Sequence, residues 1–348
     1  MATMRAWRVH EYGQPTEVLR LDEVEIPEPG PGEVRVKAQA IPLNLNDLER
    51  ITGGNMMVRP EFPYSPGMEA FGVVDACGEG AEEWMGKRVA AVTKQAFGGF
   101  AEYVICPTIA AFEIDEAIPL PDAAALFFPF HLAWLGLIDR ASLKAGDTVL
   151  IHAGAGGAGS AAIQIAKAFG ARVYATAGGP EKVALCRELG ADVAIDYLTE
   201  DFKAIVLADT DNIGVDIVFD NVGEAVMADS FACTAYNGTY LMMGFASNKV
   251  VADEKFIVPR QVTMGNFKLC GVLLNYQSDE MIGLIKQGMG WNVAPRELGE
   301  LATADIVELV KAGTVRAVVG SAPSFEDLPA AMEAMGSRNT TGRVIVML

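Results

Sequence analysis

The chain has 348 residues, of which 51% are hydrophobic and 21% charged, and its formal net charge is −18 at pH 7. This length suffices for two domains with large cores, and the composition is that of a folded globular protein. The negative charge disfavours nucleic acid and anionic membranes as partners. The sequence contains no apolar run long enough to cross a membrane and no signal-peptide core at its N-terminus, so we expect no membrane partner and a cytoplasmic location.

The first third of the chain, to about residue 125, predicts short β-strands separated by proline and glycine clusters. The run from Pro27 to Gly32 is one such turn. The strands are expected at 33–40, 71–76, 88–93 and 100–106. This pattern predicts a β-rich, barrel-like domain.

From about residue 145 to 275, strands alternate with helices, as in βαβ units. Strands are expected at 149–151, 172–175, 193–195, 216–219, 239–243 and 268–274. Helices are expected at 160–169 and at 181–189, the second ending at Gly190. Since the strands are almost continuously apolar, we expect a parallel sheet covered by helices, and six strands make a complete dinucleotide-binding domain.

The last seventy or so residues return to a mixed pattern. Helices are expected at 306–312 and 328–335, and strands at 317–319 and 343–347. The final strand is too apolar to be left exposed, so we expect it to join the first domain.

The most specific motif is Gly154-x-Gly156-x-x-Gly159, which lies between the strand at 149–151 and the helix at 160–169. The first glycine permits a tight turn, the second lets the backbone approach a pyrophosphate, and the third lets the helix pack on the strand. The helix N-terminus adds free N–H groups and a positive dipole end. In this context the spacing predicts dinucleotide binding rather than a structural turn alone.

The identity of the dinucleotide follows from the end of the second strand. NAD-binding sheets carry an acidic residue about 20 residues after the glycine turn. Here residues 175–179 read Ala-Thr-Ala-Gly-Gly, and Lys182 follows. No carboxylate repels a 2′-phosphate, and a lysine can attract one, so NADPH is expected. Taken by itself, Lys182 is better explained as part of a solvated helix face.

Metal ligands are scarce in this sequence. The five cysteines are scattered without a CxxC pair, and the three histidines form no HExxH pattern. We therefore expect no metal site. The cysteines are interpreted as small apolar residues, and His152 as a core residue beneath the glycine turn.

Six segments, together with the glycine turn at 154–159, resemble the zinc-free medium-chain dehydrogenases/reductases, most closely the quinone oxidoreductases of the zeta-crystallin type. They are Asn-Leu-Asn-Asp at 44–47, Pro-Gly-Met-Glu-Ala-Phe-Gly-Val-Val at 66–74, Gly-Gly-Phe-Ala-Glu-Tyr at 98–103, Leu-Lys-Ala-Gly-Asp-Thr-Val-Leu at 143–150, Phe-Asp-Asn-Val-Gly at 219–223, and Thr-Gly-Arg at 341–343. The resemblance covers nearly the whole chain. Zinc-dependent relatives have a histidine ligand at the position of Met68 and a cysteine ligand within 44–47, and both are missing here.

The resemblance implies an α/β fold with a Rossmann domain over 126–275 and a GroES-like catalytic domain over 1–125 and 276–348. It also implies roles for individual residues. Tyr197 and Arg338 match residues that contact the 2′-phosphate, and Asn44 matches an asparagine at the nicotinamide and substrate cleft. The full set implied or derived for the cofactor is Gly154, Gly156, Gly157, Ala158, Gly159, Gly178, Lys182, Tyr197, Asn221, Gly244, Phe245, Ala246, Val272, Leu273, Leu274 and Arg338.

The implied chemistry is hydride transfer to a small-molecule conjugated carbonyl, and a quinone is the first choice because its conjugation stabilises the developing charge without a metal. Tyr64, Tyr276 and His131 are candidate proton donors, but packing is the better interpretation of each, as structural hydrogen bonding is for Asp47 and Glu69. Three departures leave an enone or enoyl-thioester reductase open. Relatives often carry a tyrosine near Asn55 and a threonine at the position of Leu132, and the segment 276–308, with Trp291, is extended here. A non-catalytic NADPH-binding protein is the third hypothesis. The resemblance also implies a homodimer.

Overall fold

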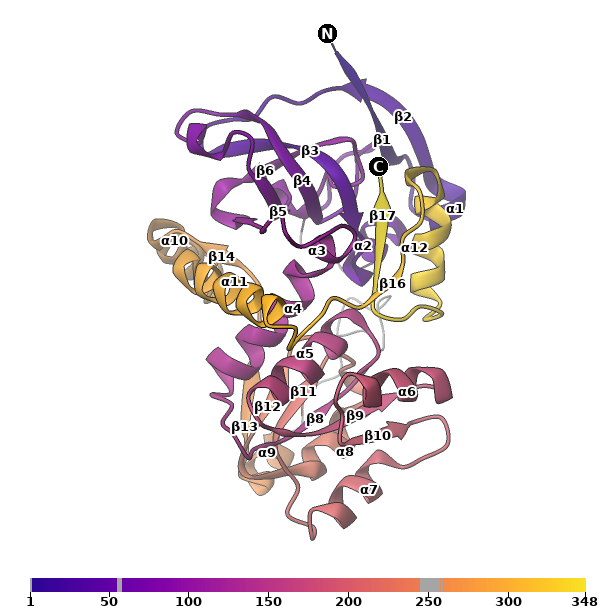
Figure 1. The fold of residues 1–348 in the computed structure, drawn as a ribbon, viewed down its shortest axis with the longest axis vertical. Coiled ribbons are helices and arrows are strands. Elements are labelled where there is room, and N and C mark those ends of the chain that lie inside the picture. The colour runs from indigo at the N-terminus through magenta and orange to yellow at the C-terminus, as the bar shows by residue number, and fades with distance from the viewer. Residues whose placement is uncertain (1, 55–57, 245–256, 258) are drawn as a thin grey trace. The chain divides into compact units, whose positions relative to one another are not determined.

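The computed structural model describes residues 2–54, 58–244, 257 and 259–348, which fold into two compact units (Figure 1). Unit 1 comprises Met1–Phe127, Asn275–Val307 and Val319–Leu348, and unit 2 comprises Phe128–Leu274 and Glu308–Val318. The sequence predicts Glu308–Val318 for the GroES-like domain, whereas this segment packs with unit 2. The Gln164 side chain holds that segment in unit 2, donating to Arg316 O at 3.0 Å and accepting from Arg316 N at 2.8 Å.

Unit 2 contains a six-stranded sheet in the order β10-β9-β8-β11-β12-β13, in which every pair is parallel. This confirms the expected doubly wound Rossmann sheet. Its strands are β8 (Thr148–Ile151), β9 (Arg172–Ala177), β10 (Val193–Asp196), β11 (Val215–Asp220), β12 (Thr234–Met242) and β13 (Lys268–Gly271). Its helices are α5 (Gly157–Ala168), α6 (Pro180–Glu188), α7 (Phe202–Asp209), α8 (Glu224–Cys233) and α9 (Pro259–Gly265), and α4 (Phe127–Trp134) precedes the sheet.

Unit 1 contains a seven-stranded sheet in the order β16-β17-β3-β4-β5-β7, with β6 paired to β3, and a separate β1-β2 pair. The strands are β1 (Thr3–Val9), β2 (Leu19–Glu25), β3 (Glu33–Pro42), β4 (Glu69–Cys77), β5 (Arg88–Val92), β6 (Tyr103–Pro107), β7 (Ala111–Glu113), β16 (Val319–Ser321) and β17 (Arg343–Met347). Short strands β14 (Tyr276–Gln277) and β15 (Ala294–Pro295) pair with each other. The antiparallel pairing of β17, yellow in Figure 1, with β3 confirms that the last strand joins the first domain.

The helices of unit 1 are α1 (Pro15–Val18), α2 (Leu45–Thr52), α3 (Asp122–Ala125), α10 (Asp279–Met289) and α12 (Leu328–Gly336), together with most of α11 (Arg296–Lys311). The helix expected at 306–312 is thus only the end of α11. Gly299 obscured its start, because glycine lowers helix propensity. The structure uses this glycine for close packing, since a Cβ there would lie 2.6 Å from the Phe112 ring.

In the described part of the chain, no helix combines the length and the apolar character that a membrane crossing needs.

Helix α5 approaches the end of β8 so closely that only glycine fits at the contact. A Cβ on Gly159 would lie 2.1 Å from the carbonyl oxygen of Ala153, well inside van der Waals contact. Ala153 itself has a left-handed backbone, with φ of 53°. This confirms the packing role expected for the third glycine of the motif.

A buried polar network joins three elements of unit 1. The carboxylate of Asp47 accepts hydrogen bonds from the backbone N–H groups of Asn44 and Met68, each at 3.0 Å. The Asn44 amide donates to Glu69 Oε2 at 3.0 Å and accepts from Arg343 Nη1 at 2.8 Å. Arg343 also forms a salt bridge with Glu69 at 2.5 Å. The network fastens α2 and β17 to β4, which confirms the structural interpretation of Asp47 and Glu69.

We expect Gly159→Ala to destabilise unit 2 by about 2–4 kcal/mol, because the new methyl group displaces α5 from β8. Gly271→Ala is the matched control in the same unit, since a Cβ there meets no heavy atom within 4 Å. Thermal unfolding of both variants measures the difference. Equal melting temperatures for the two would contradict the close contact.

We expect the effect of Asp47→Asn on stability to depend on pH. Burial raises the pKa of Asp47 to about 6, above its value in an unfolded chain. The folded state therefore binds more protons between about pH 4 and pH 6, and the wild-type protein loses about 3 kcal/mol as the pH rises through this window. The variant lacks this loss, so the destabilisation that it causes shrinks from pH 4 to pH 7 in urea titrations. A pH-independent difference would refute the assignment.

Candidate functional site

The glycine motif forms the turn between β8 and the N-terminus of α5. Gly156 is the N-cap of α5, and the bond from Ser160 N to Gly156 O, at 2.9 Å, belongs to the first turn of the helix. The N–H groups of Gly157, Ala158 and Gly159 precede this bond, so they carry the partial positive charge of the helix end. A turn of this kind is suited to bind the pyrophosphate of a dinucleotide.

A second loop follows β9, and Gly178 and Tyr197 meet in it. A Cβ on Gly178 would lie 2.6 Å from the Tyr197 hydroxyl oxygen, so the phenol stands directly over this glycine. Lys182 lies in the first turn of α6, which begins at Pro180. The structure therefore groups Gly178, Lys182 and Tyr197, all three predicted for the adenosine phosphate, around one loop.

Sequence reasoning missed the residue that shapes this second loop. Asp196 Oδ1 accepts from the backbone N–H of Gly179 at 2.9 Å and of Leu198 at 3.1 Å. The available signal was a carboxylate at the end of the third strand, one residue before Tyr197. Because this oxygen is occupied by two loop amides, Asp196 serves the loop backbone.

A third loop follows β11 and presents Asn221. The buried Asp220 carboxylate holds this loop, since Oδ1 accepts from Val222 N at 2.7 Å and Gly223 N at 3.0 Å and Oδ2 accepts from the Tyr240 hydroxyl. Asn221 Nδ2 is buried and has no hydrogen-bond partner among the described residues. Buried polar atoms are nearly always paired, so this amide donor is available to a ligand.

The remaining predicted cofactor residues follow β12 and β13. Gly244 lies against the loop of Asn221, because a Cβ on it would be 2.4 Å from Asn221 O. Val272 N donates to Met242 O at 3.0 Å, whereas the Leu273 side chain is 51% exposed. Leu274 ends unit 2. Phe245 and Ala246 lie outside the described residues.

Two of the predicted residues of unit 1, Asn44 and Tyr64, have their polar groups engaged within the unit. Asn44 lies in the buried network, where Nδ2 also contacts Pro42 O at 3.3 Å. Arg338 follows α12 with a left-handed backbone, φ of 61°. The Tyr64 hydroxyl donates to Arg50 O, and burial raises the pKa of this tyrosine.

The other two candidate proton donors are also buried. Burial lowers the pKa of His131 to about 3, so its imidazole is neutral at pH 7. The ring of Tyr276 packs edge-on against Phe112, with 5.4 Å between the ring centroids. These surroundings agree with the packing interpretation of Tyr64, His131 and Tyr276.

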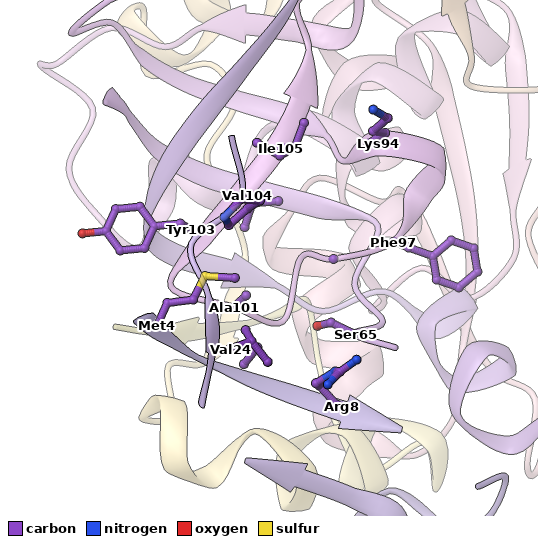
Figure 2. Close-up of a pocket in the computed structure, with 13 residues that line it drawn as sticks. Met4, Arg8, Val24, Ser65, Lys94, Phe97, Ala101, Tyr103, Val104 and Ile105 are labelled. Atoms are coloured by element: carbon purple, nitrogen blue, oxygen red, sulfur yellow. The ribbon is translucent and has the colours of Figure 1, made fainter. Parts of the chain in front are cut away.

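Figure 2 shows a cavity of about 270 Å³ within unit 1, between β1, β6 and the loop around Phe97. Apolar side chains form most of its wall. The two cations beside it have acidic partners, since Arg8 lies 3.6 Å from Asp22 and Lys94 lies 2.6 Å from Glu33. None of the predicted site residues lines this cavity.

Within residues 2–54, 58–244, 257 and 259–348, no three His, Cys, Asp or Glu side chains gather closely enough to hold a metal ion.

Comparison with known proteins agrees with this architecture. Residues 30–116 match the family model described as alcohol dehydrogenase GroES-like domain, and residues 157–289 match the one described as zinc-binding dehydrogenase. A quinone oxidoreductase of Pseudomonas aeruginosa is 33% identical over 80% of this chain and 86% of its own length. A 2-haloacrylate reductase of a Burkholderia species is 29% identical over 97% of both chains.

Among solved structures, the Escherichia coli quinone oxidoreductase complexed with NADPH superimposes with a TM-score of 0.84 at 26% identity, covering 100% of both chains. The two domain models, the relative from Pseudomonas and this superposition agree with the motifs found in the sequence. The chain belongs to the zinc-free quinone oxidoreductase family of medium-chain dehydrogenases/reductases.

Proposed function

We propose that this protein is an NADPH-dependent oxidoreductase that reduces a conjugated carbonyl compound without a metal, most specifically a quinone. The observation that carries the proposal is the group of three loops at the carboxyl ends of β8, β9 and β11. One offers helix N-terminal amides, one a lysine and a phenol, and one the unpaired amide donor of Asn221. Ligands of open α/β sheets bind at this edge.

In this proposal the glycine turn, Gly154 to Gly159, holds the pyrophosphate. Gly178, Lys182 and Tyr197 receive the 2′-phosphate, and Asn221 donates to the cofactor through Nδ2. The ends of β12 and β13, with Gly244, Phe245, Ala246, Val272, Leu273 and Leu274, hold the nicotinamide half. Asn44 and Arg338 are included in the proposal on the basis of the family resemblance alone. When bound, NADPH supplies the hydride.

The second loop supports the preference for the phosphorylated cofactor. A ribose 2′-hydroxyl is normally bound by a carboxylate at the end of the second strand. Here β9 is followed by Gly178, and the nearby Asp196 accepts from Gly179 and Leu198 instead. Apart from the Asp196 carboxylate, which holds the loop backbone, the side chains grouped at the loop are a phenol and an ammonium, both hydrogen-bond donors suited to a phosphate.

We expect Lys182→Ala to raise the Kd for NADPH about tenfold, because one charge-assisted contact to the 2′-phosphate is lost, and to leave the Kd for NADH nearly unchanged. Lys203→Ala is the control: it removes a cation from the same unit, one that pairs with Asp229. Fluorescence titration with both cofactors measures the effect. An equal loss for NADH and NADPH would contradict the assignment of Lys182 to the 2′-phosphate.

The acceptor is proposed to be conjugated because the carboxylates and the amide of the buried network are already paired. Asn44, Asp47 and Glu69 all hold partners within unit 1. A quinone stabilises the charge that develops on hydride transfer by its own conjugation. A second candidate, reduction of an enone or enoyl thioester, is favoured by the similarity to a 2-haloacrylate reductase, since a haloacrylate is also an activated alkene.

We expect the purified protein to oxidise NADPH with 1,4-benzoquinone at least about tenfold faster, in kcat/KM, than with an enone or an enoyl thioester of similar size. The absorbance of NADPH follows each reaction, and a chelator in a parallel assay checks that no metal is needed. Faster turnover of the alkene would favour the second candidate. Cofactor binding without turnover of any acceptor would favour a non-catalytic NADPH-binding protein.

A homodimer and a cytoplasmic location complete the proposal. The strand β13 lies at one edge of the unit 2 sheet, where strands of two chains can pair. Analytical ultracentrifugation distinguishes a dimer from a monomer.

A further inference from the structure

His152 lies at the centre of a buried hydrogen-bond chain beneath the glycine turn. Its Nδ1 lies 3.0 Å from Thr176 Oγ1, and its Nε2 lies 2.8 Å from Ser230 Oγ. All three side chains are buried, and the ring of Phe202 packs edge-on against the imidazole at 4.9 Å. The side chain thus joins the end of β8 to the end of β9 and to α8.

The hydrogen-bond partners determine which group donates and which accepts in this chain of hydrogen bonds. Ser230 Oγ donates its single proton to Val226 O at 2.7 Å, so it can only accept from His152. Nε2 therefore carries the imidazole proton, and Nδ1 is an acceptor for the Thr176 hydroxyl. Burial lowers the pKa of His152 to about 4, although the nearby Asp220 acts in the opposite direction. The imidazole is neutral at pH 7, and every group in the chain has a partner.

His152 and its two hydrogen-bond partners each lie next to one of the three loops of the proposed cofactor site. His152 is followed at once by the glycine turn, and Thr176 lies two residues before Gly178. A backbone bond from Gly154 N to Thr176 O, at 2.8 Å, runs parallel to the side-chain link. Ser230 lies on α8, the helix that follows the loop of Asn221.

We propose that His152 is a positioning residue that, through Thr176, fixes the distance between the pyrophosphate turn and the 2′-phosphate loop and so sets the preference for a 2′-phosphorylated dinucleotide. This inference rests on the proposed function, since it concerns the same site. A ligand that binds both loops loses affinity when their spacing changes. NADH lacks the 2′-phosphate, so its binding depends mainly on the glycine turn. Loss of the link thus weakens NADPH more than NADH.

The test compares Thr176→Val, which removes the hydroxyl and keeps the shape, with Thr176→Ser, which restores the hydroxyl. Ser230→Ala breaks the other end of the chain. Thr234→Val is the matched control, because its buried hydroxyl donates to Ser230 O at 2.8 Å but lies outside the chain through His152. The Kd values for NADPH and NADH are measured for every variant, and thermal unfolding is recorded in parallel.

We expect Thr176→Val to lower the ratio of the NADH Kd to the NADPH Kd about tenfold, Ser230→Ala to lower it in the same direction, and Thr176→Ser to restore it. Thr234→Val lowers the melting temperature without changing the ratio. An unchanged ratio in Thr176→Val, with wild-type binding intact, would overturn this inference alone. Failure of the wild-type protein to bind NADPH would overturn the proposed function, and the inference with it.

Discussion

The contact between Gly159 and the carbonyl of Ala153 is the constraint on which the rest of unit 2 depends. Because α5 begins against the end of β8, its N-terminal amides lie at the carboxyl edge of the sheet. The same contact leaves Ala153 in a left-handed conformation, so the turn has one shape. The site is thereby built from backbone, and the side chains around it serve to hold that backbone in place.

Two carboxylates hold the neighbouring loops in a similar way. Asp196 accepts from two amides of the loop beside Gly178, and Asp220 accepts from two amides of the loop that presents Asn221. Each carboxylate replaces the water that the loop amides would otherwise need. His152 joins the glycine turn to the end of β9. Rigid loops of this kind bind a ligand with little loss of conformational entropy.

The fold was predictable from the sequence to a large extent, because the signals are local. Buried parallel strands are apolar throughout, and all six expected strands of the sheet are present, although β13 ends at Gly271 and not at Leu274. The glycine spacing is also a local signal, and it predicted the turn between β8 and α5. The start of α11 was not predictable, because Gly299 lowers helix propensity and its compensation is a contact with Phe112, far away in the sequence.

The partners of the buried polar groups were beyond the reach of sequence reasoning. His152 was correctly expected in the core, yet its link to Thr176 and Ser230 joins residues 24 and 78 positions apart. Neither hydroxyl stands out in the sequence. Likewise, the bonds between Gln164 and Arg316, which join the segment Glu308–Val318 to unit 2, span 152 positions. Such contacts have no periodicity, so only the folded chain reveals them.

Tyr64 illustrates how the folded chain also limits the chemistry. A tyrosine beside a cleft motif is a reasonable proton donor in sequence, but its hydroxyl donates to Arg50 O and its pKa is raised by burial. Transfer of that proton would leave a buried phenolate against a carbonyl oxygen, which is unfavourable. Tyr64 is therefore poorly suited as the acid for an acceptor that needs strong acid assistance in the hydride step. The proposed quinone needs no such acid, because its reduced oxygens take protons readily from water, whereas reduction of an enoyl thioester also requires that a carbon be protonated after the hydride step.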